Sequence, residues 1–69
     1  MAGDRQWFHD AVSLLRAAGG EHVRTTGGHA IWRVGGRTIA VPAHAHACGS
    51  PRAQKNVLAA IRRTIRVAN

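Results

Sequence analysis

The sequence predicts a small α+β domain in the order α-β-β-β-α, with a three-stranded antiparallel sheet and both helices on one face. Three observations predict this fold. An apolar stripe with helical spacing lies near each end of the chain, three short alternating segments lie between the stripes, and a Gly-Gly pair separates each segment from the next. The chain has 69 residues, which is room for one domain, so we expect a single domain over residues 1–69.

The first helix is expected from Gln6 to Ala18. Asp4 can cap its start, and Gly19-Gly20 can end it because glycine readily takes the left-handed conformation that closes a helix. Its apolar residues recur at steps of three and four and are widened by two neighbours: Phe8, Ala11, Val12, Leu15 and Ala18, with Trp7 and Leu14.

Three strands are expected next, at Glu21–Thr26, His29–Val34 and Arg37–Val41. A Gly-Gly pair between alternating segments indicates a two-residue hairpin turn, whose favoured forms need positive φ. The register set by the second turn pairs Val34 with Arg37, and it places on the core face Ala30, Trp32, Val34, Ile39 and Val41.

The other face of this sheet is expected to be open and polar. It carries His29, Ile31, Arg33, Thr38 and Ala40, because side chains alternate along each strand. If Val23 of the first strand points into the core, His22 and Arg24 join this open face. The sheet then has one apolar side and one basic side.

The last helix is expected after a loop from Pro42 to Gly49. Ser50 is a capping residue, and Pro51 suits the first helical position. The buried stripe is formed by Val57, Leu58, Ile61 and Ile65. Both helices should cover the apolar face of the sheet, because the other face is too polar to bury.

The charge of the chain predicts a polyanionic partner. Nine arginines and one lysine against three acidic residues give a formal net charge of +7. A small, strongly cationic domain is attracted to nucleic acid first of all, and the planar guanidinium fork suits phosphate. Lys55 and the group Arg62, Arg63 and Arg66 would form the wider electrostatic surface.

Other features predict a cytoplasmic protein that does not interact with membranes. No apolar run approaches the roughly 20 residues that span a bilayer, and the N-terminus is polar and acidic, unlike a signal peptide. The single cysteine, Cys48, cannot form an internal disulfide, which agrees with a reducing compartment.

Five histidines raise the question of a metal site. His44, His46 and Cys48 alternate along one loop, but structural zinc usually takes two close pairs of ligands, and no second pair is present. We therefore expect no metal and no cofactor. His9 and His22 are expected to be solvated surface histidines.

His29 differs from the other histidines in its setting. It follows Gly27-Gly28 at the start of a strand on the open face, and glycine lets a nucleic-acid backbone approach closely. A histidine can take or give a proton near neutral pH, while Arg24 and Arg33 could hold a phosphate. Those groups suffice to cleave RNA, whose own 2′-hydroxyl supplies the nucleophile. A purely structural role for a histidine beside a turn is the alternative.

The run "GGEHVRTTGGHAIWRVGGRTIAVPAHAHACGS" resembles the HicA toxins of toxin–antitoxin systems, and the resemblance covers about Trp7 to Arg66. That family has a helix ending in glycine, an Arg-x-x-Gly-Ser-His motif, a hairpin, a Pro-x-His motif and a second helix with a Leu-x-x-Ile step. The matching residues are Gly19, Arg24, Gly27, Gly28, His29, Val41, Pro42, Ala43, His44, Leu58 and Ile61. In this chain Gly28 stands where the family usually has serine.

The resemblance implies a double-stranded-RNA-binding-like fold and a metal-independent endoribonuclease that cleaves mRNA and is neutralised by a HicB-like antitoxin. His29 matches the catalytic histidine of the family. The expected RNA-binding residues are Arg24, Gly28, Arg33, Lys55 and Arg62. Two alternatives remain open: a non-catalytic module that binds RNA or a protein partner through the same basic face, and an assembly component whose arginines are simply solvated.

Overall fold

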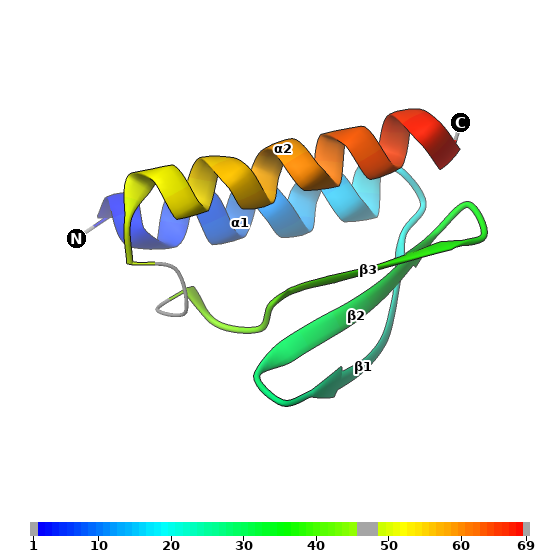
Figure 1. Cartoon of the computed structure of the whole chain (residues 1–69), viewed down its shortest axis with the longest axis horizontal. Helices are drawn as coiled ribbons and strands as arrows, with labels where there is room; N and C mark the ends of the chain where they lie inside the picture. The colour runs from blue at the N-terminus through cyan, green and yellow to red at the C-terminus, as the bar shows by residue number, and fades with distance from the viewer. Residues whose placement is uncertain (1, 46–48, 69) are drawn as a thin grey trace.

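A computed structural model of the chain describes residues 2–45 and 49–68. Its elements are α1 (Ala2–Ala17), β1 (Glu21–Thr26), β2 (His29–Val34), β3 (Arg37–Pro42) and α2 (Pro51–Ala68). The two helices lie side by side on one side of a three-stranded sheet, as Figure 1 shows. The predicted α+β class and the order α-β-β-β-α are confirmed. Within the described ranges, no helix has the length and apolar character that crossing a bilayer requires.

The sheet has the order β1-β2-β3, and both strand pairs are antiparallel. The register between β2 and β3 is the predicted one, with Trp32 opposite Ile39 and Val34 opposite Arg37. Burial along β2 alternates, so Ala30, Trp32 and Val34 are buried against the helices while His29 and Arg33 are exposed. The two faces of the sheet are therefore separated as the alternation predicts.

The core lies between this sheet face and the two helices. Leu15 of α1 and Ile61 of α2 have no exposed surface, and burying each such side chain stabilises the fold by about 1.5–3 kcal/mol. The other buried residues come from α1, β2 and β3: Trp7, Ala11, Ala30, Trp32, Val34 and Val41. Both predicted apolar stripes thus face the core.

Two glycines cap the C-terminal end of α1, and a serine side chain caps the N-terminal end of α2. The Gly20 N–H donates to the Leu15 carbonyl (2.7 Å) and the Gly19 N–H to the Arg16 carbonyl (3.0 Å), with Gly19 at φ 79°. This pair of bonds is a Schellman motif, which satisfies the last carbonyls of α1. At the start of α2, the Ala53 N–H donates to Ser50 Oγ (3.1 Å), so the predicted cap is confirmed.

The predicted start of α1 is wrong. The helix begins at Ala2, so Asp4 lies within its first turn and not at the capping position. No proline precedes Asp4, and Ala2 favours a helix, so the backbone is helical before that residue although Gly3 has a low helix propensity. The capping pattern at Asp4 therefore marks no boundary.

The predicted orientation of two residues in β1 is also wrong. The register places His22 opposite Trp32 and Arg24 opposite Ile31, so Val23 is the extra residue of a β-bulge. Val23 is 44% exposed instead of buried. His22 lies on the helix side, with its ring 5.5 Å from that of Trp32. The bulge restores the alternation beyond it, so Arg24 keeps its predicted place on the open face.

Candidate nucleic-acid interface

The turn before His29 has the backbone that the Gly-Gly pair predicts. Gly27 and Gly28 have φ values of 57° and 80°, and a type I′ hairpin turn needs positive φ at both positions. A Cβ atom on either glycine would meet nothing within 4 Å. The turn is fixed by its glycines and leaves open space beside the first residue of β2.

His29 is exposed and belongs to the open face of the sheet. Its Nδ1 lies 3.3 Å from the Gly27 carbonyl oxygen. A carbonyl only accepts hydrogen bonds, so this contact requires the proton on Nδ1 and leaves Nε2 of the neutral ring as an acceptor. The turn therefore orients the imidazole so that its basic nitrogen is free to take a proton.

The two arginines of the open face differ in their distance from His29. Arg24 pairs with Ile31, which puts it on the diagonal from His29, where the Cα atoms of strand neighbours are about 7–8 Å apart. Arg33 is four residues along β2, or about 13 Å at the usual rise per residue. A guanidinium nitrogen of Arg33 also donates to Glu21 (3.1 Å), and both side chains are more than half exposed. Arg24 is the better placed of the two to hold a phosphate beside His29.

Thr26 is a polar neighbour of His29 that the sequence analysis missed. It pairs directly with His29 across the turn, and both residues are exposed. Side chains of directly paired residues lie on the same face about 4.5–5.5 Å apart at Cβ. The signal was present in the sequence, because a two-residue turn always pairs the residues that flank it.

Lys55 and Arg62 lie in another part of the molecule. Both are exposed residues of α2, which lies with α1 on one side of the sheet (Figure 1). His29 belongs to the other, open face, because the alternate residues of β2 are buried against the helices. Arg62 lines a shallow hollow between the helices together with Asp10. The structure thus brings together His29, Gly28 and Arg24, with Arg33 at the far end of the same face, and separates Lys55 and Arg62 from them.

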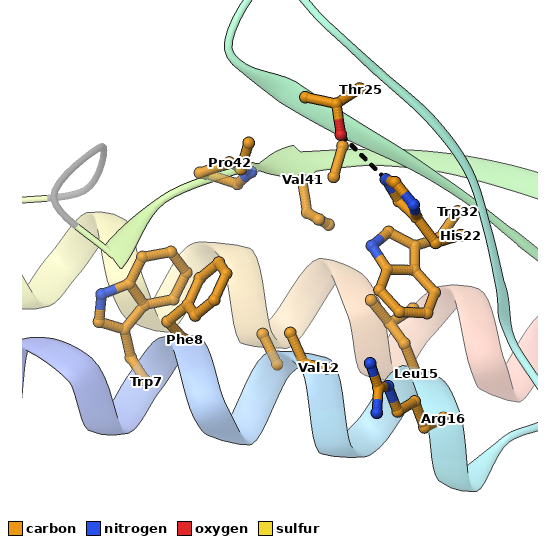
Figure 2. A pocket seen from close by; sticks show the side chains of 13 residues that line it. Trp7, Phe8, Val12, Leu15, Arg16, His22, Thr25, Trp32, Val41 and Pro42 are labelled. Carbon is orange, nitrogen blue, oxygen red and sulfur yellow. Dashed lines mark hydrogen bonds between the residues drawn. The ribbon is translucent and has the colours of Figure 1, made fainter.

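A groove of about 350 Å³ runs between α1 and the helix side of the sheet. Figure 2 shows apolar side chains from both walls, including Phe8, Val12 and Val41, with Arg16 at the α1 end. On the sheet wall, His22 Nε2 lies 2.9 Å from Thr25 Oγ1. The groove is mainly apolar and lies on the opposite face from His29.

Metal ligands do not gather in the described part of the chain. There, no group of three or more His, Cys, Asp or Glu side chains is arranged to hold an ion. Two of the loop residues considered for zinc, His46 and Cys48, lie outside the described residues. His44 is described and exposed.

Comparison of the chain with protein-family models, curated proteins and solved structures finds no match. The resemblance to HicA toxins therefore stays a prediction from motifs. The candidate site is supported by the positions of the residues themselves.

Proposed function

We propose that this protein is a metal-independent endoribonuclease of the HicA type. The observation that carries the proposal is the position of His29: exposed on the basic sheet face, oriented by the Gly27 carbonyl and next to Arg24. The open turn lets an RNA backbone come close to the ring. The double-stranded-RNA-binding-like classification of the fold belongs to this proposal.

The reaction would proceed by internal transfer. Nε2 of His29 takes the proton of a ribose 2′-hydroxyl, the 2′-oxygen attacks the adjacent phosphorus, and the bond from phosphorus to the 5′-oxygen breaks. The departing 5′-oxygen receives a proton from the imidazolium, which leaves a 2′,3′-cyclic phosphate and a 5′-hydroxyl. Arg24 would stabilise the negative charge that develops on the phosphoryl oxygens.

Replacement of His29 tests this function, and His22 provides a matched control on the opposite face of the sheet. His29→Ala should lower RNA cleavage in the presence of a chelator by about 10²–10⁴-fold, the usual contribution of general acid–base catalysis. His22→Ala should leave cleavage within a few-fold of wild type, and both variants should retain RNA affinity. Equal cleavage by wild type and His29→Ala would refute the assignment.

The partners follow from the same proposal. The substrate would be mRNA in the cytoplasm, and a HicB-like antitoxin with an acidic surface would cover the open face and neutralise the enzyme. The formal charge of +7 supports both polyanionic partners. If an antitoxin candidate binds His29→Ala and wild type equally and stops growth inhibition by wild type, this part of the proposal is supported.

A non-catalytic binding module is the second candidate. The apolar groove between α1 and the sheet favours it, because such a groove can receive side chains of a protein partner. In that case wild type would bind RNA or the partner without cleaving RNA. A cleavage assay with purified wild type and chelator separates the two functions.

A further inference from the structure

A second hollow lies beside the N-terminal half of α1, outside the site around His29. It has a volume of about 480 Å³. Three of its lining residues, Arg5, His9 and His44, carry basic side chains, and among the residues whose side chains the structure describes none of the lining is acidic. The other described lining residues are apolar: Phe8, Val12, Ala43 and Ala45.

Helical spacing places one wall of this hollow. Arg5 and His9 are four residues apart in α1, so their side chains are neighbours on one face of the helix. Phe8 and Val12, also four residues apart, form the apolar part of the same wall and are partly buried. The hollow thus has basic groups beside an aromatic ring.

The opposite wall is the segment from Ala43 to Ala45, which is held on both sides of His44. The Ala43 N–H donates to the Gly28 carbonyl (3.0 Å). On the other side, Trp7 Nε1 donates to the Ala45 carbonyl (3.2 Å). These bonds fix the backbone of an exposed histidine against α1 and join the hollow to the turn that precedes His29.

We propose that this hollow binds the phosphate of a nucleotide and is a second nucleotide subsite for an RNA strand that passes over the Gly27-Gly28 turn to His29. Arg5 supplies a permanent positive charge and a planar donor fork. Each imidazole has at least one N–H donor in either charge state. Phe8 supplies a surface on which a base or sugar can pack, as aromatic side chains do for single-stranded nucleic acid.

The assignment of the subsite to RNA rests on the proposed function, whereas nucleotide binding in the hollow does not. Because the hollow is separate from His29, the subsite would contribute to substrate binding and not to bond cleavage. Loss of its contacts should raise KM and leave kcat unchanged. Loss of His29 should lower kcat and leave KM unchanged.

The direct test is an NMR titration of the full chain with adenosine 5′-monophosphate, with inorganic phosphate in a parallel arm. Binding in the hollow should shift the ring signals of His9 and His44 and the Nε signal of Arg5, with no shift at His22. Weaker binding of inorganic phosphate would show that the nucleoside packs against Phe8. Equal binding would restrict the site to phosphate and overturn the nucleotide assignment. Shifts confined to His29, or an adventitious anion effect spread over all arginines, would overturn the subsite.

Variants provide the second test. The double variant Arg5→Gln, His44→Asn should weaken nucleotide binding at least five-fold and raise KM for RNA by a similar factor. Arg16→Gln is the matched control, since Arg16 is also an exposed arginine of α1 but lines the other groove. Circular dichroism and thermal melting establish that each variant is folded.

The outcomes distinguish the two proposals. If wild type does not cleave RNA but binds the nucleotide at His9 and His44, nucleotide binding in the hollow is supported and the proposed endoribonuclease activity is refuted. If wild type cleaves RNA and the double variant has unchanged KM and nucleotide affinity, the enzyme stands and the subsite is wrong. His29→Ala should leave nucleotide affinity unchanged, and a loss of affinity in that variant would place the nucleotide at His29 instead.

Discussion

The two hairpins of the sheet have the same turn and opposite surroundings. Gly27-Gly28 between β1 and β2 has φ values of 57° and 80°, and Gly35-Gly36 between β2 and β3 has 55° and 84°. A Cβ atom on Gly27 or Gly28 would meet nothing within 4 Å, whereas one on Gly35 would lie 2.8 Å from the Cβ of Ala68. One turn is open beside His29, and the other is packed against the end of α2.

The strands of the two hairpins differ in the same way. β2 and β3 pair in unbroken register, and the helices cover their apolar face. β1 has a bulge at Val23, and all six of its residues are exposed. The shared Gly-Gly pair therefore produces the same type of turn, while contact with the helices decides which hairpin stabilises the fold and which is free to bind.

Alanine substitutions in the two turns are expected to differ most in their effect on the free energy of unfolding. Gly35→Ala should lower the free energy of unfolding by about 2–4 kcal/mol, because the residue would have positive φ and would also clash with Ala68. Gly27→Ala should cost about 1 kcal/mol, since only the positive φ opposes it. Urea denaturation of both variants measures the difference.

Two controls separate the clash from the backbone conformation. Gly36→Ala lies in the packed turn at φ 84° but has no neighbour within 4 Å of its Cβ, so it should behave like Gly27→Ala. Adding Ala68→Gly to Gly35→Ala removes the closest atom and should restore part of the lost stability. If Gly35→Ala and Gly36→Ala cost the same, packing against α2 does not distinguish the turns.

A smaller effect is expected from removing the bulge in β1. Deleting Val23 leaves His22 opposite Trp32 and Arg24 opposite Ile31, so both faces of the sheet keep their residues. The free energy of unfolding should change by less than about 1 kcal/mol, as for an exposed site, and RNA cleavage should persist. Thermal unfolding and the cleavage assay measure these quantities.

Deletion of Thr25 is the matched control for the Val23 deletion. It also shortens β1 by one residue, but it would place Arg24 opposite Ala30 and turn its side chain toward the helices. RNA affinity should then fall, and the free energy of unfolding should be lower than that of the Val23 deletion. Equal behaviour of the two deletions would mean that Arg24 has no role on the open face.

The bulge also shows where sequence reasoning about this protein reaches its limit. Alternation and the Gly-Gly turns predicted the register of β2 with β3 and the outward position of His29, because both are local rules. They misplaced His22 and Val23, because β1 contains one strongly apolar residue, Val23, and its sequence therefore has too little alternation to reveal an extra residue. Arg5, His9 and His44 were not grouped because their proximity depends on how the loop packs against α1.

The smallest effect concerns the ion pair between Glu21 and Arg33. Both side chains are largely exposed, and such pairs contribute about 0–1 kcal/mol, so Glu21→Gln should barely change the free energy of unfolding. It should, however, release Arg33 for a phosphate and strengthen RNA binding at low salt. One added phosphate contact would steepen the plot of log affinity against log salt by about 0.7–0.9.

Asp10→Asn tests whether the stronger RNA binding of Glu21→Gln comes from the release of Arg33 or from the higher net charge. Each substitution removes one negative charge and raises the formal charge from +7 to +8, but Asp10 lies on α1, where it accepts a hydrogen bond from Gln6. If Arg33 contacts RNA, only Glu21→Gln should steepen the salt dependence measured by fluorescence anisotropy. An equal change in both variants would show that the open face attracts RNA through its overall field alone. The ion pair with Glu21 would then have no bearing on RNA binding, and Arg33 would have no phosphate contact of its own.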